Sequence, residues 1–308
     1  MFSRDSTSYH TINSDFQLNL FRKILYFVFN YLNFFFDCSR PRKMLFFEKF
    51  QITDPISEVS GDLERISVSR FLSDSFWSQI DYNYLKEVLG SNLQVVDVGC
   101  GSGKYRNILK LSDKDHYLGI DISSSPFWSE PVERNVSFRQ TSYLNVHDYM
   151  PNVNLIITQS AIEHFEFDLL FFKEIRRFVQ ESGQPLVQIH LFPAKAGLWT
   201  GLLHGIRQYN LRMVLRIVGA SKLQIPAILV TLGGPKSNRF HWNSVTKFLL
   251  SHSYEKTFTS KLGYKEDLKK AILGDNSSVL TRKATFFALI MQNNCSVELE
   301  YSSLINQK

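Results

Sequence analysis

Short runs of apolar, β-branched residues recur along the chain and alternate with stretches in which apolar residues have helical spacing. Runs of this kind, bounded by Gly, Pro, Asn or Asp, are typical of buried strands. They predict seven strands, at residues 93–98, 117–122, 136–138, 154–159, 186–191, 254–260 and 285–291.

The stretches between these runs predict helices at residues 66–80, 81–89, 104–110, 169–180 and 244–251. Gly90 and Gly183 follow two of them, where a glycine commonly ends a helix. Alternating strands and helices predict an α/β fold with a doubly wound parallel sheet. Such a sheet binds its ligand at the carboxyl ends of the strands.

Three alternating glycines, Gly99, Gly101 and Gly103, follow the first predicted strand, and Asp97 lies near the end of that strand. A carboxylate there is costly unless it has a partner. Glycines between a strand and a helix let a ligand approach the backbone closely. The dinucleotide fingerprint would need a glycine where Lys104 stands, and no Gly-Lys-Ser/Thr of a Walker loop follows.

Asp97 and the glycines through Gly103 resemble motif I of class I S-adenosylmethionine-dependent methyltransferases, of the methyltransferase type 11 kind. Asp121 supports this resemblance, because the family carries an acidic residue at the end of the second strand, where it accepts the ribose hydroxyls. It lies about 18 residues after Gly103, which leaves room for one helix and a right-handed return. The resemblance covers residues 90–192 and implies a Rossmann-like, seven-stranded sheet whose last strand, at 285–291, is antiparallel.

The resemblance also implies the cofactor, S-adenosylmethionine. No metal is expected, because no set of carboxylates in the sequence resembles a divalent-metal site. An acidic group before the glycines suits the ammonium of this cofactor, and exposed backbone N–H groups suit its carboxylate. Ser142 departs from the family pattern, which commonly has an acidic residue near the adenine amine, and Val153-Asn154 stands where Phe-Asp is frequent. The cofactor-binding residues implied in this way are Asp97, Gly99, Cys100, Gly101, Gly103, Asp121, Ile122, Ser142, Tyr143 and Gln159.

Residues 1–89 are predicted to form an N-terminal helical region that precedes a methyltransferase domain of residues 90–308. Within this region, residues 16–37 form a helix rich in Phe and Tyr, with basic residues near both ends. Its apolar part is about 13 residues long, short of the ~20 that a membrane-spanning helix needs. Two interpretations stay open: a lid over the cofactor cleft, or a helix that lies in the membrane interface.

Residues 194–235 interrupt the alternation after the fifth predicted strand and are predicted to form a helical cap on the substrate side. Part of this segment resembles the cap of bacterial methyltransferases found with surface-polysaccharide biosynthesis. That resemblance implies a sugar hydroxyl as the methyl acceptor. Arg207 and Tyr209, in the cap, and His241 are therefore candidate substrate-binding residues, and the alternative for the first two is a solvated helix face.

A hydroxyl acceptor benefits from a general base. His164 follows the fourth predicted strand and His204 lies in the cap, so these two are the candidate catalytic residues. The alternative for His164 is a structural histidine bonded to the neighbouring helix. His190 lies in a strand predicted to be buried on both faces, which favours a role in the core.

Net charge and cysteine content restrict the ligands that the chain could bind and the compartment in which it works. The net charge of +6 is spread along the chain, which fits anionic membranes or substrates, whereas nucleic-acid binding usually shows a denser basic run. Cys38, Cys100 and Cys295 lie far apart, which argues against a disulfide framework or a zinc site and fits a reducing cytoplasm.

We therefore predict a cytoplasmic methyltransferase, peripheral to the inner face of the membrane if the N-terminal helix binds lipid. Its predicted reaction is O-methylation of a sugar or another small-molecule hydroxyl in surface-glycan biosynthesis. Two alternatives remain: a lipid or quinone-like acceptor in the membrane, and a methyltransferase-like binding module without catalysis.

Overall fold

The computed structural model describes residues 20–35, 44–52, 67–129, 135–195, 205–246, 263–276 and 283–305. Within these ranges the chain forms an eight-stranded sheet with the strand order β1-β7-β8-β6-β5-β2-β3-β4. Neighbouring strands are parallel, except that β8 is antiparallel to both β6 and β7. The strands are β1 (Leu45–Lys49), β2 (Gln94–Val98), β3 (His116–Asp121), β4 (Val136–Gln140), β5 (Leu155–Gln159), β6 (Leu186–Pro193), β7 (Ala227–Leu232) and β8 (Phe286–Asn293).

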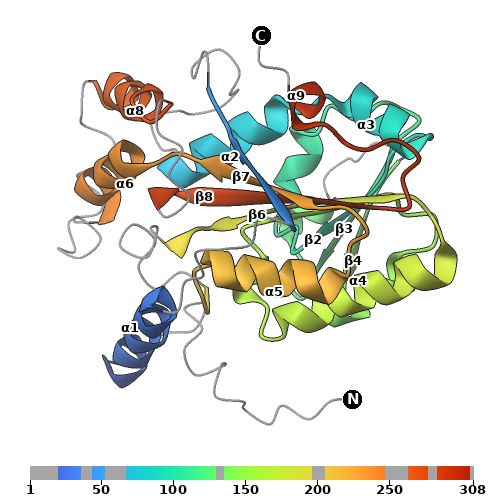
Figure 1. Cartoon of the computed structure of the whole chain (residues 1–308), viewed down its shortest axis with the longest axis horizontal. Coiled ribbons are helices and arrows are strands. Elements are labelled where there is room, and N and C mark those ends of the chain that lie inside the picture. Colours follow the sequence, from blue (N-terminus) through green and yellow to red (C-terminus); the bar gives the residue numbers. More distant parts are fainter. Residues whose placement is uncertain are drawn as a thin grey trace.

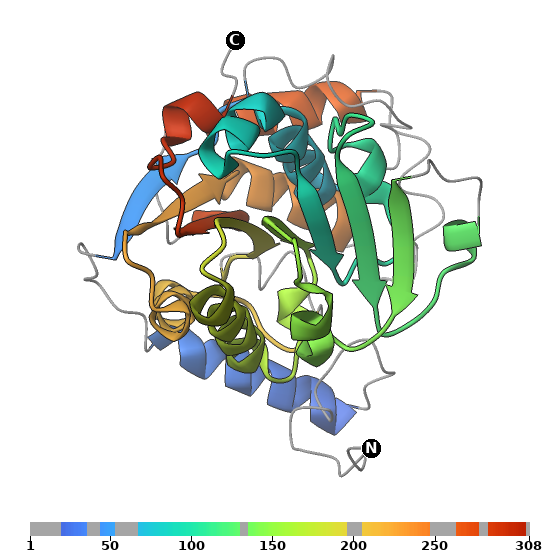
Figure 2. The same ribbon diagram turned by 90° about the vertical axis from the view of Figure 1, so that its right-hand side faces the viewer.

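Helices cover both faces of this sheet (Figures 1 and 2). One face packs against α2 (Val68–Ser78), α3 (Tyr82–Leu89), α6 (Pro235–His241), α8 (Tyr264–Leu273) and the short α9 (Tyr301–Leu304). The other face packs against α4 (Asp168–Ser182) and α5 (Leu211–Ser221). The helix α1 (Leu20–Phe35) lies beyond α4 and α5, on the outside of that layer (Figure 2). The predicted α/β class with a doubly wound sheet is confirmed.

Local sequence signals explain where several helices begin and end. The Asp81 side chain accepts hydrogen bonds from the backbone N–H groups of Asn83 and Tyr84, so α3 begins at the next residue after Asp81. Gly90 and Gly183 end α3 and α4 in the left-handed conformation, at φ 68° and 67°. The predicted helices at 81–89 and 169–180 therefore match their observed counterparts.

Six of the seven predicted strands lie where the pattern placed them, as β2 to β6 and β8. The seventh, at 254–260, lies outside the described residues. In the place expected for it, beside the antiparallel β8, the structure has β7, which comes from within the predicted cap at 194–235. All six residues of β7 are buried, so this apolar run belongs to the sheet and not to a cap.

The remaining part of the predicted cap that the structure describes also differs from the expectation. In it, α5 packs along α4 and buries Val214, Ile217 and Val218 against the sheet. The eighth strand, β1, was not expected and adds a parallel edge beside β7.

The predicted helix at 104–110 is only a single 3-10 turn, Lys104–Asn107. Asp115 explains the difference, because its carboxylate accepts hydrogen bonds from the backbone N–H and the hydroxyl of Ser112, both at 2.7 Å. This turn leads directly into β3 at His116 and leaves too few residues for a helix. Of the predicted helix at 244–251, only 244–246 are described, and they belong to a π-helical turn, Trp242–Thr246.

None of the described helices has the length and apolar character needed to cross a membrane.

Candidate functional site

The glycine turn (residues 99–103) follows β2 and is held against the end of β3. Gly99, Gly101 and Gly103 all have left-handed backbones, at φ 76°, 54° and 76°. The N–H groups of Gly99 and Cys100 donate to the carbonyl of Ile120, at 2.8 and 3.2 Å. A Cβ on Gly99 would lie 2.5 Å from the Cβ of Ala161, so only glycine lets the turn approach the loop after β5.

Asp97 is a buried carboxylate beneath this turn, 1% exposed. The Tyr117 hydroxyl donates to its Oδ2 at 2.6 Å. Its Oδ1 has no hydrogen-bond partner among the described residues. The pKa of Asp97 is raised to about 7: burial and, to a smaller extent, the charge of Asp121 raise it, and the hydrogen bond from Tyr117 partly offsets them. A buried, half-satisfied carboxylate of this kind fits a cationic ligand group that would complete its bonding.

Asp121 stands at the tip of β3, beside the turn. Its Oδ2 accepts from the N–H of Gly101 at 2.9 Å, and its Oδ1 accepts from the N–H of Ser123 at 3.0 Å. A carboxylate has about four lone-pair positions, so both oxygens keep the capacity to accept ligand hydroxyls. Burial, with Asp97 and Asp121 nearby, raises the pKa of the Cys100 thiol, which is therefore neutral and unreactive at neutral pH.

The helix α2 covers the end of β5 and the start of the 3-10 turn at 104–107. The Trp77 indole N–H donates to Gln159 Oε1 at 2.9 Å, and Gln159 Nε2 donates to the Ser73 hydroxyl at 3.0 Å. The buried Asp74 accepts from Lys104 Nζ at 3.1 Å and from the Tyr105 hydroxyl at 3.2 Å. These contacts join α2 to two of the segments that surround Asp97.

Aromatic side chains pack beside the glycine turn on its β4 side. Trp128 donates its indole N–H to the carbonyl of Gly101 at 2.9 Å. Its ring stacks on Phe138, with centroids 5.2 Å apart and planes 8° apart. A Cβ on Gly103 would lie 2.4 Å from the Phe138 ring, so this glycine also makes room for a neighbour.

A family model described as "Methyltransferase domain" matches residues 96–187, which span β2 to the start of β6. The matched residues include the glycine turn, Asp121 and the loop after β5. Residues 96–187 therefore form a methyltransferase domain. The sheet order around β2, with β3 on one side and β5 on the other, agrees with this assignment.

Solved structures with similar folds include the plantazolicin methyltransferase BamL and a SAM-dependent methyltransferase from Archaeoglobus fulgidus. The first is 14% identical and aligns over 74% of this chain and 85% of its own, with a TM-score of 0.45. The second is 11% identical and aligns over 69% of this chain and 92% of its own, with a TM-score of 0.42. Similarity at this level carries no inference about the methyl acceptor. No curated protein sequence matches the chain significantly.

Three other predicted cofactor residues lie at the same edge of the methyltransferase domain. Ile122 follows β3 and is exposed, and Ser142 accepts the N–H of Leu144 as the cap of the 3-10 helix that follows β4. The Tyr143 ring stacks on Phe165 with centroids 4.0 Å apart, and its hydroxyl accepts the N–H of Phe167 at 3.0 Å. The Tyr143 contacts join the segment after β4 to the loop after β5, and that loop also lies against Gly99.

The candidate histidines have different environments. His164 ends the short 3-10 helix Ile162–His164 after β5 and is half-buried, whereas its neighbour Glu163 is fully buried. His190 is fully buried in β6, where Thr158 and Gln188 contact its two ring nitrogens and burial lowers its pKa to about 3. Such a neutral histidine belongs to the core, as predicted. His204 lies outside the described residues.

His241 and the two cap residues are buried instead of facing solvent. His241 lies on α6, and burial lowers its pKa to about 4. Arg207 forms an ion pair with Asp168 at 2.7 Å and donates to the carbonyl of Glu166 at 3.0 Å. The Tyr209 hydroxyl contacts the same Asp168 carboxylate at 2.8 Å and the carbonyl of Ile162 at 3.1 Å. The alternative interpretation of Arg207 and Tyr209, a solvated helix face, is therefore wrong. Their side chains join the segment before α5 to α4 and to the loop after β5.

The sequence predicts α2 as an apolar helix before the first strand, and the family resemblance implies that such helices cover the cofactor. It gives no role in the site to Trp77 or Asp74, which lie on this helix. The signal was present, because an acidic residue on the apolar face of a helix needs a buried partner. The partners, Lys104 and Tyr105, lie directly after the glycine turn.

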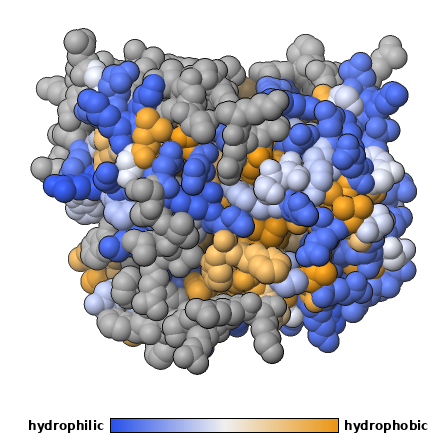
Figure 3. All heavy atoms as spheres, turned by 45° about the horizontal axis from the view of Figure 1, so that its top comes forward, coloured by the Kyte–Doolittle hydropathy of each residue, from blue (hydrophilic) through white to orange (hydrophobic). Residues whose placement is uncertain are grey.

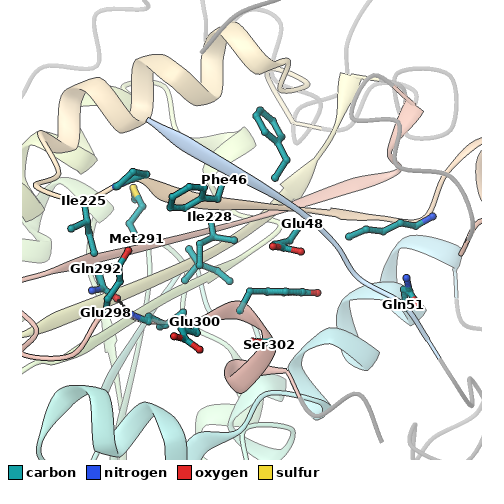
Figure 4. Close-up of a pocket in the computed structure, with 16 residues that line it drawn as sticks. Phe46, Glu48, Gln51, Ile225, Ile228, Met291, Gln292, Glu298, Glu300 and Ser302 are labelled. Carbon is teal, nitrogen blue, oxygen red and sulfur yellow. Dashed lines mark hydrogen bonds between the residues drawn. The ribbon is translucent and has the colours of Figure 1, made fainter. Parts of the chain in front are cut away.

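A cavity of about 700 Å³ lies away from this site (Figure 4). It is bounded by β1 along most of its length, the start of β7, the end of β8 and the residues from 298 to 302 at the start of α9. None of these residues belongs to the glycine turn, to β3 or to the loop after β5. The surface of Figure 3 also shows apolar atoms near its centre among mostly hydrophilic surroundings. A ligand in this cavity would not contact the glycine turn.

No group of three His, Cys, Asp or Glu in the described ranges is arranged to hold a metal ion.

Proposed function

We propose that Asp97, the glycine turn and Asp121 hold S-adenosylmethionine. In this proposal, Asp97 binds the ammonium, the exposed turn faces the carboxylate, and Asp121 accepts the ribose hydroxyls. The observation that carries the proposal is the buried Oδ1 of Asp97, which has no partner among the described residues. Ile122, Ser142, Tyr143 and Gln159 are proposed as further contacts, because they end or follow the neighbouring strands β3, β4 and β5.

The reaction that this site supports best is O-methylation of a sugar or another small-molecule hydroxyl. When bound, S-adenosylmethionine supplies an electrophilic methyl group, so the chain must align the acceptor and exclude water. We assign His164 as the general base that takes the hydroxyl proton, because it is half-buried and lies after β5, whose loop contacts Gly99. The cover formed by α2 helps to exclude water from this edge.

A lipid or quinone-like acceptor is the second candidate function. One observation favours it: α1 exposes a row of large apolar side chains and packs on the segment that follows β6. A surface of this kind would bring the chain to a membrane that contains the acceptor. The third candidate is a methyltransferase-like module without catalysis, which would bind the cofactor but transfer no methyl group.

Asp121→Asn should weaken binding of the demethylated cofactor product by at least about tenfold, because an amide cannot replace the carboxylate as the acceptor of two ribose hydroxyls. Titration calorimetry would measure the dissociation constant. Asp148→Asn, on the 3-10 helix after β4, is the matched control and should leave it unchanged. Equal affinity of Asp121→Asn and the unmodified chain would contradict the assignment.

The acceptor itself can be found with methyl-labelled S-adenosylmethionine and cell extract. After incubation, the label would be fractionated into glycan and small molecules, lipid, protein and nucleic acid. We expect label in the first fraction. Label in lipid would favour the second candidate function, and cofactor binding without any label would indicate the binding module.

His164→Ala should lower the transfer rate by about 10²–10⁴-fold at neutral pH without changing cofactor affinity, which is the typical contribution of a general base. His147→Ala is the matched control, because His147 bonds to Glu181 on the surface of α4. Rates would be measured with whichever fraction accepts the label. A variant that retains the full rate would exclude His164 as the base.

A further inference from the structure

The helix α1 turns most of its apolar side chains away from the protein. Seven large apolar residues of this helix are between 38% and 75% exposed. They form the outer face of α1: Leu20, Phe21, Ile24, Leu25, Val28, Tyr31 and Leu32. A continuous row of seven exposed, large apolar side chains is uncommon on a protein that works alone in water. Such a surface indicates contact with another apolar surface.

The inner face of α1 is fixed by a small, specific contact. Tyr26 is fully buried against Ile206, and Phe27 packs on the same cluster. The Asn30 amide donates to the carbonyl of Ile206 at 3.4 Å, and its oxygen accepts the N–H of Gln208 at 2.9 Å. Because these contacts set the rotation of α1, its outer apolar face is held in a defined orientation.

We infer that the outer face of α1 docks on an anionic lipid surface. The helix contains no acidic residue, and Arg22 and Lys23 lie in its first turn. On the same side of the sheet, α5 carries the exposed residues Arg212 and Arg216 (Figure 1). An amphipathic helix with aromatic and aliphatic residues on one face and basic residues beside it is suited to the interface of an anionic bilayer. The charge favours lipid over an apolar protein surface.

The length of α1 agrees with a helix that lies in the interface. Its 16 residues span about 24 Å, and it does not qualify as a membrane-spanning segment. The inner contact also places the catalytic edge near the lipid. Ile206 donates its N–H to the carbonyl of Glu163 at 2.7 Å, next to His164. Docking would therefore bring the loop after β5 close to the membrane surface.

Vesicle sedimentation tests this inference with the full chain. We expect it to bind vesicles of phosphatidylcholine and phosphatidylglycerol more tightly than vesicles of phosphatidylcholine alone. The double variant Ile24→Gln/Val28→Gln should lower the partition coefficient at least about tenfold, because two exposed apolar side chains no longer enter the lipid. Lys23→Gln should lower binding about fivefold, and only on the anionic vesicles.

Val297→Gln is the matched control, because Val297 is equally exposed but lies in the loop before α9. It should bind vesicles as the unmodified chain does. Unchanged melting temperatures and circular dichroism spectra would show that every variant folds. The inference is overturned if the full chain binds neither kind of vesicle, or if Ile24→Gln/Val28→Gln binds as well as the unmodified chain. It is also overturned if sedimentation equilibrium shows a dimer that this variant converts to a monomer without any vesicle binding, since the face would then join two copies.

Discussion

Replacing Asp97 by Asn should make the fold more stable above neutral pH and, at the same time, weaken its binding of S-adenosylmethionine. The first effect follows from the pKa of Asp97, which burial raises from 3.8 to about 7. The unfolded chain ionises this group near pH 4, so the fold loses stability as pH rises from about 4 to 7. Above pH 7 the loss is on the order of 4 kcal/mol. Asn carries no charge and can still accept the Tyr117 hydroxyl, so it removes this loss.

The second effect has the opposite sign because the proposed ligand group is a cation. Without the negative charge of Asp97, the dissociation constant of the demethylated cofactor product should rise about 10- to 100-fold. In the unmodified chain, affinity should fall as pH drops below 7, since Asp97 must release its proton before it can pair with an ammonium. Calorimetry in two buffers of different ionisation enthalpy would detect this release.

Asp115→Asn is the control for the stability effect. Asp115 is also fully buried, and burial raises its pKa, but hydrogen bonds from Lys86, Ser112 and Leu93 lower it more, with a net decrease. Its stabilising effect is present above pH 4 and is lost as pH falls, so Asp115→Asn should destabilise the fold at pH 8. Urea unfolding at pH 5 and pH 8 would compare the two variants. The prediction fails if Asp97→Asn is less stable than the unmodified chain at pH 8. That result would mean that neighbouring groups stabilise the ionised carboxylate of Asp97 and keep its pKa low.

Gly99→Ala should cost about 3 kcal/mol of folding free energy. Its backbone lies at φ 76°, where an L-residue costs roughly 1–2 kcal/mol. The added Cβ would also lie 2.5 Å from that of Ala161, and overpacking of this kind typically costs 1–3 kcal/mol. The turn and the loop after β5 would have to separate, so we expect cofactor binding to weaken as well.

Gly101→Ala separates the two causes, because Gly101 has a left-handed backbone but open space around the position of a Cβ. It should cost only about 1 kcal/mol. Chemical denaturation of both variants would give the difference. Equal losses would mean that the loop after β5 moves aside without cost, and that the close approach at Gly99 does not shape the site.

The parts of the site that could be predicted are those whose signal lies within a few residues. Asp97, the alternating glycines and Asp121 stand beside apolar strands, so pattern and spacing were sufficient to place them. The 3-10 turn after the glycines could not be predicted from helix propensity, because Asp115 closes the chain into a turn. The strand β7 could not be distinguished by local pattern, because its apolar run follows a basic amphipathic helix and both lie within the predicted cap.

The cap residues show the limit of reasoning from local pattern. Arg207 and Tyr209 look like surface recognition residues, since nothing near them in the sequence is acidic. Their partner, Asp168, is about 40 residues away and reaches them only through the packing of α4 and α5. Burial of this kind is a tertiary property, so local pattern could not show that both side chains pair with Asp168.

The position of β8 constrains the order in which the sheet can form. This strand is among the last segments described, yet it lies between β6 and β7, and β1 pairs only with β7. As the chain leaves the ribosome, β1 must therefore wait for about 240 residues of synthesis before its edge of the sheet exists. Long-range pairing of this kind slows folding. During that interval the half of the sheet that carries the glycine turn can assemble first, while β1 and β7 can join it only through β8.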